Sequence, residues 1–258
     1  MENKDYYNDR FYEDSDLGSI TAANTVLPML FETWRPASLI DVGCGLGSWS
    51  AAALKLGVPL CLGVDGAHVN MDSLQISPTM FLAHNLELPL PQNLSAEMAI
   101  CIEVAEHLSP QRAGGLVSDL CRIAPIVLFS GAVPYQGGTG HINENWPEYW
   151  AALFARCGYQ PYDIIRDRIW SLASVPWWYR QNLLLFAQPN FARDRLGLAQ
   201  PSPPASLARI HPEQFLLAVH RQRMMATRRL DEDRAHYRQS VAGEIVEAGY
   251  GSEFDIRF

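Results

Sequence analysis

Short apolar runs alternate with helix-like segments from Ser38 to about Ala187. Several runs are continuously apolar and bounded by turn residues, which is typical of strands buried on both faces of a mainly parallel sheet. The pattern therefore predicts an α/β fold in which helices cover such a sheet. The expected strands are Ser38–Val42, Leu60–Asp65, Thr79–Ala83, Ala96–Glu103, Ile126–Ser130, Gln160–Arg166 and Leu183–Gln188, and the expected helices are Thr21–Thr33, Ser48–Leu56, Gln111–Arg122, Trp146–Cys157 and Pro212–Gln239.

Residues 189–210 are rich in Pro, Ala, Arg and Ser, which predicts a linker between a domain of residues 1–188 and a helical C-terminal extension of residues 211–258. The extension mixes apolar residues with arginines and is typical of an amphipathic helix. Because Asp231, Glu232 and Asp233 directly follow its arginines, we expect a solvated face that docks on its own domain or on a second subunit, as in a homodimer, rather than on nucleic acid.

Composition narrows the possible partners. The chain has 258 residues, a formal net charge of −8 and 48% hydrophobic residues. An acidic chain is a poor general binder of polyanions, so no nucleic-acid partner is expected. The acidic N-terminus has no signal-peptide character, and no apolar run approaches the ~20 residues that span a bilayer. These features predict a cytoplasmic protein with no membrane partner.

A glycine-rich turn follows the first expected strand, in the sequence Leu39-Ile40-Asp41-Val42-Gly43-Cys44-Gly45-Leu46-Gly47. Glycines allow positive φ and let the backbone come close to a ligand, and amides at the start of the next helix can bind a carboxylate or phosphate. Asp65 ends the second expected strand, where an acid can accept hydrogen bonds from ribose hydroxyls. The spacing Gly-x-Gly-x-Gly differs from the dinucleotide fingerprint, which disfavours NAD. By themselves, the glycines would also fit a tight strand-to-helix turn.

With these residues, the chain resembles the class I S-adenosylmethionine-dependent methyltransferases, in particular the small-molecule group with the signature Asp-Val-Gly-Cys-Gly-x-Gly and bacterial sugar or natural-product enzymes. The resemblance implies a Rossmann-like sheet of seven mainly parallel strands, an N-terminal helical lid, and S-adenosyl-L-methionine as cofactor with S-adenosyl-L-homocysteine as product. It places the glycine turn along the methionine part, Asp65 at the ribose, and Asn85 with Leu86 beside the adenine. The cofactor contacts that it implies are Asp41, Gly43, Cys44, Gly45, Asp65, Gly66, Asn85, Leu86 and Glu103.

The segment Cys101-Ile102-Glu103-Val104-Ala105-Glu106-His107-Leu108 also resembles this family. If it is helical, Glu103, Glu106 and His107 share one face. Some quinone O-methyltransferases use a similar Glu-x-x-Glu-His to hold a divalent cation, so Mg²⁺ at these three residues is an alternative. The interpretation that we favour is a network that shapes the cofactor pocket without a metal.

A glycine-rich loop around His141 follows the fifth expected strand and resembles the Gly-His-x-Asn-Glu loop of methyltransferases that act on sugars or other small polar acceptors. Ligands of open α/β folds bind at the carboxyl ends of the strands, where this loop lies. His141 is therefore the candidate catalytic base, although it could also merely brace the loop. Two aromatic groups have open roles. Trp177, Trp178 and Tyr179 could line the pocket or pack in the core, and Tyr6, Tyr7, Phe11 and Tyr12 could form a lid over the cofactor or simply pack.

Methyl transfer depends mainly on proximity and alignment, but a hydroxyl acceptor must also lose its proton, and histidine suits that role. The sequence thus favours O-methylation of a small molecule with His141 as base. N-methylation of an amine or peptide is the alternative within enzymes, and a non-catalytic cofactor-binding scaffold is the alternative outside them. RNA methylation is disfavoured by the acidic charge.

Overall fold

A single seven-stranded sheet forms the centre of this computed structural model, which describes residues 9–225 and 227–229, with side chains in the first helix from Leu17 onward. The strand order is β3-β2-β1-β4-β5-β7-β6. All neighbours pair in parallel except β7, which is antiparallel to both β5 and β6. The strands are β1 Ser38–Val42, β2 Leu60–Asp65, β3 Phe81–Ala83, β4 Met98–Ile102, β5 Ile126–Ser130, β6 Gln160–Tyr162 and β7 Leu184–Ala187. The predicted α/β class with a mainly parallel sheet is confirmed.

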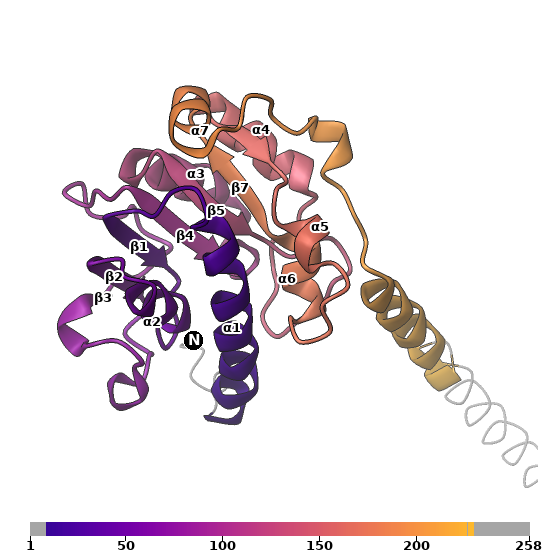
Figure 1. The fold of residues 1–258 in the computed structure, drawn as a ribbon. Coiled ribbons are helices and arrows are strands. Elements are labelled where there is room, and N and C mark those ends of the chain that lie inside the picture. The colour runs from indigo at the N-terminus through magenta and orange to yellow at the C-terminus, as the bar shows by residue number, and fades with distance from the viewer. Residues whose placement is uncertain (1–8, 226, 230–258) are drawn as a thin grey trace, which may run out of the picture. The chain divides into compact units, whose positions relative to one another are not determined.

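Alternation of side chains along the strands builds one hydrophobic core on each face of the sheet. In β4, Met98 and Ile100 belong to one core, whereas Ala99 and Cys101 belong to the other. Figure 1 shows α1 and α2 on one side of the sheet and α3 and α4 on the other. The helices are α1 Asp9–Leu30, α2 Ser48–Lys55, α3 Ala113–Ile123, α4 Pro147–Arg156, α5 Arg166–Ile169, α6 Trp177–Asn182 and α7 Pro189–Leu196.

Two strands are shorter than predicted, because a proline or a polar residue near one end of the strand belongs to a turn or helix instead. β3 begins at Phe81 because Pro78–Met80 forms a 3-10 turn whose first amide bonds to Ser77 Oγ. β6 ends at Tyr162, since Asp163 pairs with the fully buried Arg166 of α5. The short helices α5 and α6 were not predicted, because each has too few residues to show a helical period.

The Pro-rich stretch 189–210 is not a linker, which corrects the expectation from composition. It begins with α7, whose Ala192 is fully buried in the same core as α1 and α2. Leu207 is fully buried in the opposite core, and its carbonyl accepts a hydrogen bond of 2.8 Å from Arg166 Nη1. The first compact unit accordingly extends to His211 and the second begins at Pro212.

We predict that a chain ending at His211 stays folded, whereas one ending at Gln188 loses about 3 kcal/mol of unfolding free energy. The shorter chain gives up the buried Leu196 and Leu207 side chains, each of which stabilises by about 1.5–3 kcal/mol when fully buried. Urea unfolding of the two chains at one pH measures the difference. Equal stability of both chains would contradict the packing of residues 189–211 and support an independent linker.

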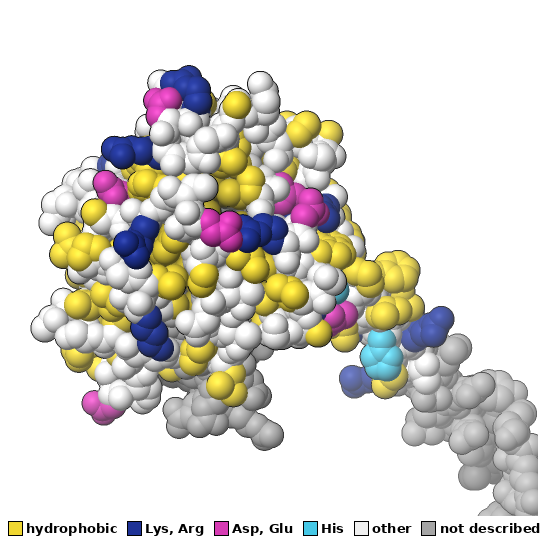
Figure 2. Space-filling model, viewed as in Figure 1, with side chains coloured by type: hydrophobic (Ala, Val, Ile, Leu, Met, Phe, Trp, Pro, Cys, Tyr) yellow, Lys and Arg dark blue, Asp and Glu magenta, His cyan; other side chains and the backbone are white. Residues whose placement is uncertain are grey.

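The described part of the second unit is helical over residues 212–225, and residues 230–258 of the predicted helix and extension lie outside the described residues. Within the described ranges no helix is long and apolar enough to cross a membrane. Figure 2 shows acidic and basic side chains interspersed with apolar and neutral ones on the visible face of the first unit.

Candidate functional site

The candidate site lies at the carboxyl edge of the sheet, next to β1 and β4. After β1 the chain continues to β2 and β3 on one side, whereas β4 starts the other half of the sheet. Such a reversal of strand order leaves a crevice beyond the carboxyl ends of the two central strands, and ligands of open α/β sheets bind there. The glycine turn follows β1, Glu103 follows β4, and the His141 loop follows β5.

The glycine turn has a backbone that only glycine adopts without strain. Gly43, Gly45 and Gly47 have φ values of 77°, 53° and 86°. A Cβ on Gly43 would lie 2.2 Å from Cγ2 of Val104, so this residue is required for close packing against the chain after β4. A Cβ on Gly45, by contrast, would have no atom within 4 Å. The backbone at Gly45 thus borders open space in which a ligand can approach it.

Asp65 at the end of β2 is held beside this turn by backbone amides. Its Oδ2 accepts a hydrogen bond of 2.7 Å from Gly45 N, and its Oδ1 accepts one of 2.6 Å from Gly66 N. His68 Nε2 lies 3.8 Å from Oδ1. Each carboxylate oxygen keeps a second lone pair, so the side chain can still accept hydrogen bonds from a bound diol. The structure therefore brings Gly45, Asp65 and Gly66 together as predicted.

Asp41 and Cys44 point into the protein rather than toward the open side of the turn. Asp41 is 2% exposed, and its Oδ2 accepts a hydrogen bond of 3.1 Å from Ser50 Oγ. Burial raises the pKa of Asp41 to about 7, against the lowering effect of the Ser50 hydrogen bond. Cys44 Sγ packs over the backbone of Gly63, so this residue can offer a ligand only its main chain.

Asn85 and Leu86 lie beyond β3 and have different environments. Asn85 is exposed, and its Oδ1 accepts a hydrogen bond of 3.0 Å from Glu87 N, which forms a local turn and leaves the amide nitrogen available. Leu86 is buried in the core beside α3. Its carbonyl accepts a hydrogen bond of 2.8 Å from Arg112 Nε, which fixes this segment against the rest of the domain.

Glu103 adopts a left-handed backbone with φ of 54°, an uncommon conformation for a residue with a side chain. Its carboxylate accepts hydrogen bonds from Gln136 Nε2 at 3.0 Å and from Asn182 Nδ2 at 3.1 Å. The segment after β4 is therefore not an α-helix: Glu103 is left-handed, and Ala105–His107 forms a 3-10 turn. This corrects the expectation that Glu103, Glu106 and His107 share one helix face.

Glu106 and His107 are buried polar groups with unsatisfied atoms. Glu106 is 0% exposed, and neither carboxylate oxygen has a hydrogen-bond partner of good geometry among the described residues. Burial, followed by the nearby Glu103 carboxylate, raises the pKa of Glu106 well above its ordinary value. Burial, followed by the adjacent His141, lowers the pKa of His107 to about 4. Both shifts favour the neutral form of the side chain.

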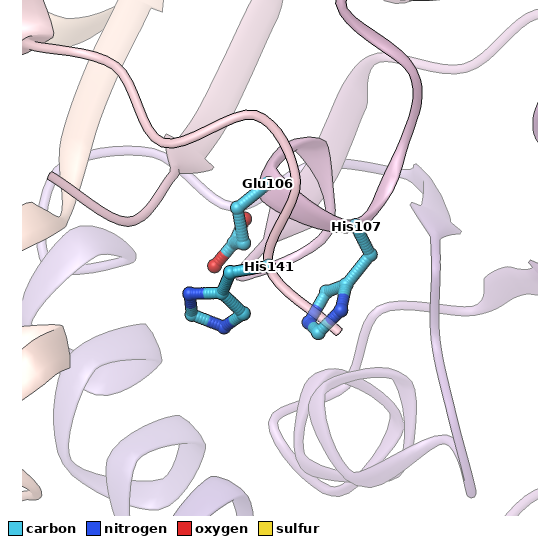
Figure 3. Close-up of side chains that lie close together, drawn as sticks. All are labelled: Glu106, His107 and His141. Carbon is cyan, nitrogen blue, oxygen red and sulfur yellow. The ribbon is translucent and has the colours of Figure 1, made fainter. Parts of the chain in front are cut away.

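The loop that carries His141 is fixed to the turn after β4 by main-chain hydrogen bonds. The carbonyl of Glu106 accepts hydrogen bonds from the amides of Ile142 at 2.8 Å and Asn143 at 3.1 Å. Asn143 Nδ2 also donates to the carbonyl of Ala105 at 3.1 Å. As a result the His107 and His141 rings meet edge to face, with centroids 4.8 Å apart (Figure 3).

Glu144 orients His141, a role that the sequence motif containing this residue did not assign to it. Its Oε1 lies 3.0 Å from His141 Nδ1 and accepts a hydrogen bond of 2.7 Å from Gly137 N, while Oε2 accepts one of 2.8 Å from Tyr135 N. A carboxylate only accepts hydrogen bonds, so the neutral imidazole carries its hydrogen on Nδ1 and its lone pair on Nε2. Gly138 packs against the His141 ring, where a Cβ would lie 2.3 Å from Nε2 and 2.5 Å from Cε1.

The aromatic residues before β7 contribute mainly to packing. Tyr179 is buried in the core, and its hydroxyl lies 2.8 Å from Ser19 Oγ of α1. Trp178 packs against that core, and Trp177 is half-buried. For the predicted lid, Tyr6 and Tyr7 lie outside the described residues, as do the side chains of Phe11 and Tyr12.

The strand order, the reversed β7 and the glycine turn after β1 define the fold of class I S-adenosylmethionine-dependent methyltransferases. One solved structure with this fold is magnesium protoporphyrin IX methyltransferase from Synechocystis PCC 6803 with bound S-adenosylhomocysteine. It is 16% identical with a TM-score of 0.51, and the match covers 69% of this chain and 87% of that chain. Another is a protein of Nostoc punctiforme PCC 73102 described as an O-methyltransferase, 12% identical with a TM-score of 0.50, covering 69% of this chain and 58% of that one.

A curated relative is ribosomal protein L11 methyltransferase of Edwardsiella ictaluri (strain 93-146), which is 31% identical over 105 residues. The match covers 39% of this chain and 31% of that protein, so the chain spans less than a third of this relative's length. No family model matches the chain. At these identities the solved structures establish the fold.

Proposed function

We propose that the protein is an S-adenosylmethionine-dependent methyltransferase that methylates a hydroxyl group of a small molecule. The observation that carries this proposal is the open glycine turn at Gly45 with the Asp65 carboxylate beside it. The exposed backbone suits the aminoacyl part of the cofactor, and the carboxylate suits its ribose hydroxyls. The cofactor contacts that we propose are those expected from the sequence. Asp41 contributes by supporting the glycine turn from the protein interior, because its side chain is buried.

When bound, this cofactor supplies a methyl group that is already activated for direct displacement. The contribution of the chain is then to position the acceptor and to take its proton. We assign the proton to His141 Nε2, because Glu144 holds Nδ1 and the lone pair is then on the other ring nitrogen. Glu144 also stabilises the imidazolium that forms. Gly138 packs closely against the His141 ring and helps to fix its position.

A small acceptor is supported by the interspersed surface charges and the net charge of −8, which suit a compact polar substrate better than a polyanion. The polar groups near His141 suit a hydroxylated compound such as a sugar or natural product. N-methylation predicts little dependence on His141, since a neutral amine needs no strong base. Substitution of His141 therefore distinguishes the two reactions, because it should slow O-methylation strongly and N-methylation little.

We predict that Gly45→Ala weakens binding of S-adenosylmethionine and S-adenosylhomocysteine at least about tenfold, which corresponds to ~1.4 kcal/mol. The new methyl group would occupy the open space beside the turn, where the ligand must approach. Calorimetric titration of the full chain measures both ligands. A wild-type chain that binds neither ligand would overturn the proposed function.

Gly158→Ala is the matched control for this substitution. Gly158 also has positive φ, 80°, and a Cβ at this position would likewise have no atom within 4 Å, but Gly158 precedes β6 at the opposite edge of the sheet. Both variants therefore suffer the backbone strain of about 1 kcal/mol, and only Gly45→Ala should affect the ligand. Equal ligand affinity in the two variants would place the cofactor elsewhere.

The homodimer expected from the sequence is also a proposal. The described helix over residues 212–225 belongs to the second compact unit and carries the exposed apolar residues Phe215, Leu216 and Met224. A second copy of the helix could bury these side chains. Light scattering of the full chain and of a chain ending at His211 gives the oligomeric state of each.

A further inference from the structure

The side chains of Glu106, His107 and His141 come together from two loops that follow different strands. One carboxylate oxygen and one nitrogen from each imidazole lie within 4.8 Å of one another (Figure 3). We propose that these three residues form a binding site for a divalent transition-metal ion of the zinc or cobalt type. The site differs from the Mg²⁺ alternative that the sequence suggests, because Glu103 is engaged by Gln136 and Asn182 and His141 takes its place.

The unsatisfied atoms of the cluster indicate that it lacks a partner. Both oxygens of the fully buried Glu106 have no hydrogen-bond partner of good geometry among the described residues, and the same holds for the buried His107 Nδ1. A buried polar group without a partner is unfavourable, more so when it is charged, so such groups are usually paired or bind an ion. A cation between the three side chains would give the Glu106 carboxylate a partner.

A glycine packs against the ring of His141. A Cβ on Gly138 would lie 2.3 Å from Nε2, 2.5 Å from Cε1 and 2.8 Å from Cδ2 of His141, over the ring rather than in line with the Nε2 lone pair. This close approach and the contact with Glu144 fix the His141 ring, and hydrogen bonds to the Glu106 carbonyl fix the loop that carries it. The three side chains therefore belong to an ordered structure.

The ligand set selects the kind of ion. Two imidazoles and one carboxylate suit zinc, cobalt or iron, whereas Mg²⁺ and Ca²⁺ prefer oxygen ligands. Metal–ligand distances of about 2.1 Å place ligand atoms roughly 3–3.5 Å apart, so side-chain shifts of about 1 Å would close the site. Glu144 already holds His141 Nδ1, which is the carboxylate–imidazole contact that orients histidine ligands in metal sites.

An ion at this site would compete with the acceptor proton for the lone pair of His141. Bound metal is therefore expected to inhibit methyl transfer and a chelator to restore it. This consequence rests on the proposed function, whereas metal binding itself does not.

The test titrates Co²⁺ into the full chain after dialysis against a chelator and follows visible absorption, with Zn²⁺ as competitor. We expect saturable binding that His107→Ala weakens about 100-fold, the upper end of effects seen even for groups that only support ligands. Glu106→Gln keeps the size of the side chain and should weaken binding at least about tenfold. His220→Ala removes a histidine of the second unit and should leave binding unchanged, and circular dichroism checks that each variant is folded.

Absence of saturable Co²⁺ and Zn²⁺ binding, or equal binding by wild-type and His107→Ala chains, would overturn the site. Binding of Mg²⁺ in preference to both would overturn the choice of ion. In a methyl-transfer assay, inhibition by Zn²⁺ that a chelator reverses supports the competition. Stimulation of methyl transfer by Zn²⁺ would overturn both the proposed competition and the role of His141 as base. The Co²⁺ titration would still test the metal site independently.

Discussion

Replacing His141 by glutamine is expected to lower kcat by about 10²–10⁴-fold, because a positioned general base typically contributes that much. In free energy this corresponds to roughly 3–5 kcal/mol of transition-state stabilisation. Glutamine retains a polar side chain that can contact Glu144, but it cannot take the acceptor proton. The measurement is single-turnover transfer of labelled methyl to an acceptor found by screening hydroxylated metabolites, in buffer freed of metal ions.

The same variant should bind S-adenosylmethionine as the wild-type chain does, since His141 is not one of the cofactor contacts that we propose. His220→Gln, in the second unit, controls for loss of a histidine as such. A His141→Gln chain that keeps more than about a third of the wild-type rate, where chemistry limits turnover, would show that His141 only braces its loop. N-methylation would then be the better explanation.

The wild-type chain is expected to lose about 4 kcal/mol of stability relative to Asp41→Asn as the pH rises from 4 to 8. Burial raises the pKa of Asp41 to about 7 in the folded chain, whereas an unfolded aspartate has a pKa of about 3.9. Between these values the folded state holds a proton that the unfolded state has released. Stability therefore falls as the pH rises, and the loss is complete once the pH exceeds the folded pKa.

Asparagine cannot titrate and can still accept the hydrogen bond from Ser50, so it removes only this dependence. Urea unfolding of both chains at several pH values gives the difference in unfolding free energy, in which titrating groups that do not interact with Asp41 cancel. Asp72→Asn, which removes an exposed carboxylate, should show no such trend. If the difference in unfolding free energy between the wild-type and Asp41→Asn chains does not change with pH, Asp41 is charged in the folded chain.

The buried strands were predictable because their apolar runs have clear limits. β1, β2 and β5 have the bounds expected from the sequence, since a glycine follows each of them and a proline directly precedes β2 and β5. The stretch 189–210 was not predictable, because its composition resembles a linker while only a few of its residues are buried. Ala192 and Leu207 show their role only when the two cores are known.

The candidate site was predictable where a local motif marks it. The glycine turn and Asp65 lie at the ends of neighbouring strands, so their contact follows from the order of the strands. The contacts of His107 with His141 and of Glu103 with Asn182 join segments far apart in the chain, and no local pattern indicates them. Glu144 could have been suspected from its spacing of three residues from His141, but only the fold of the loop turns that spacing into a contact.

The double hydrogen bond to the Glu106 carbonyl has a consequence for protein engineering. Because the amides of Ile142 and Asn143 share this one acceptor, the loop of residues 131–146 depends for its conformation on the segment of residues 103–108. A loop transplanted alone onto another scaffold of this fold would leave its anchor behind. The exchangeable module is the pair of segments, and libraries that alter acceptor choice should diversify both together.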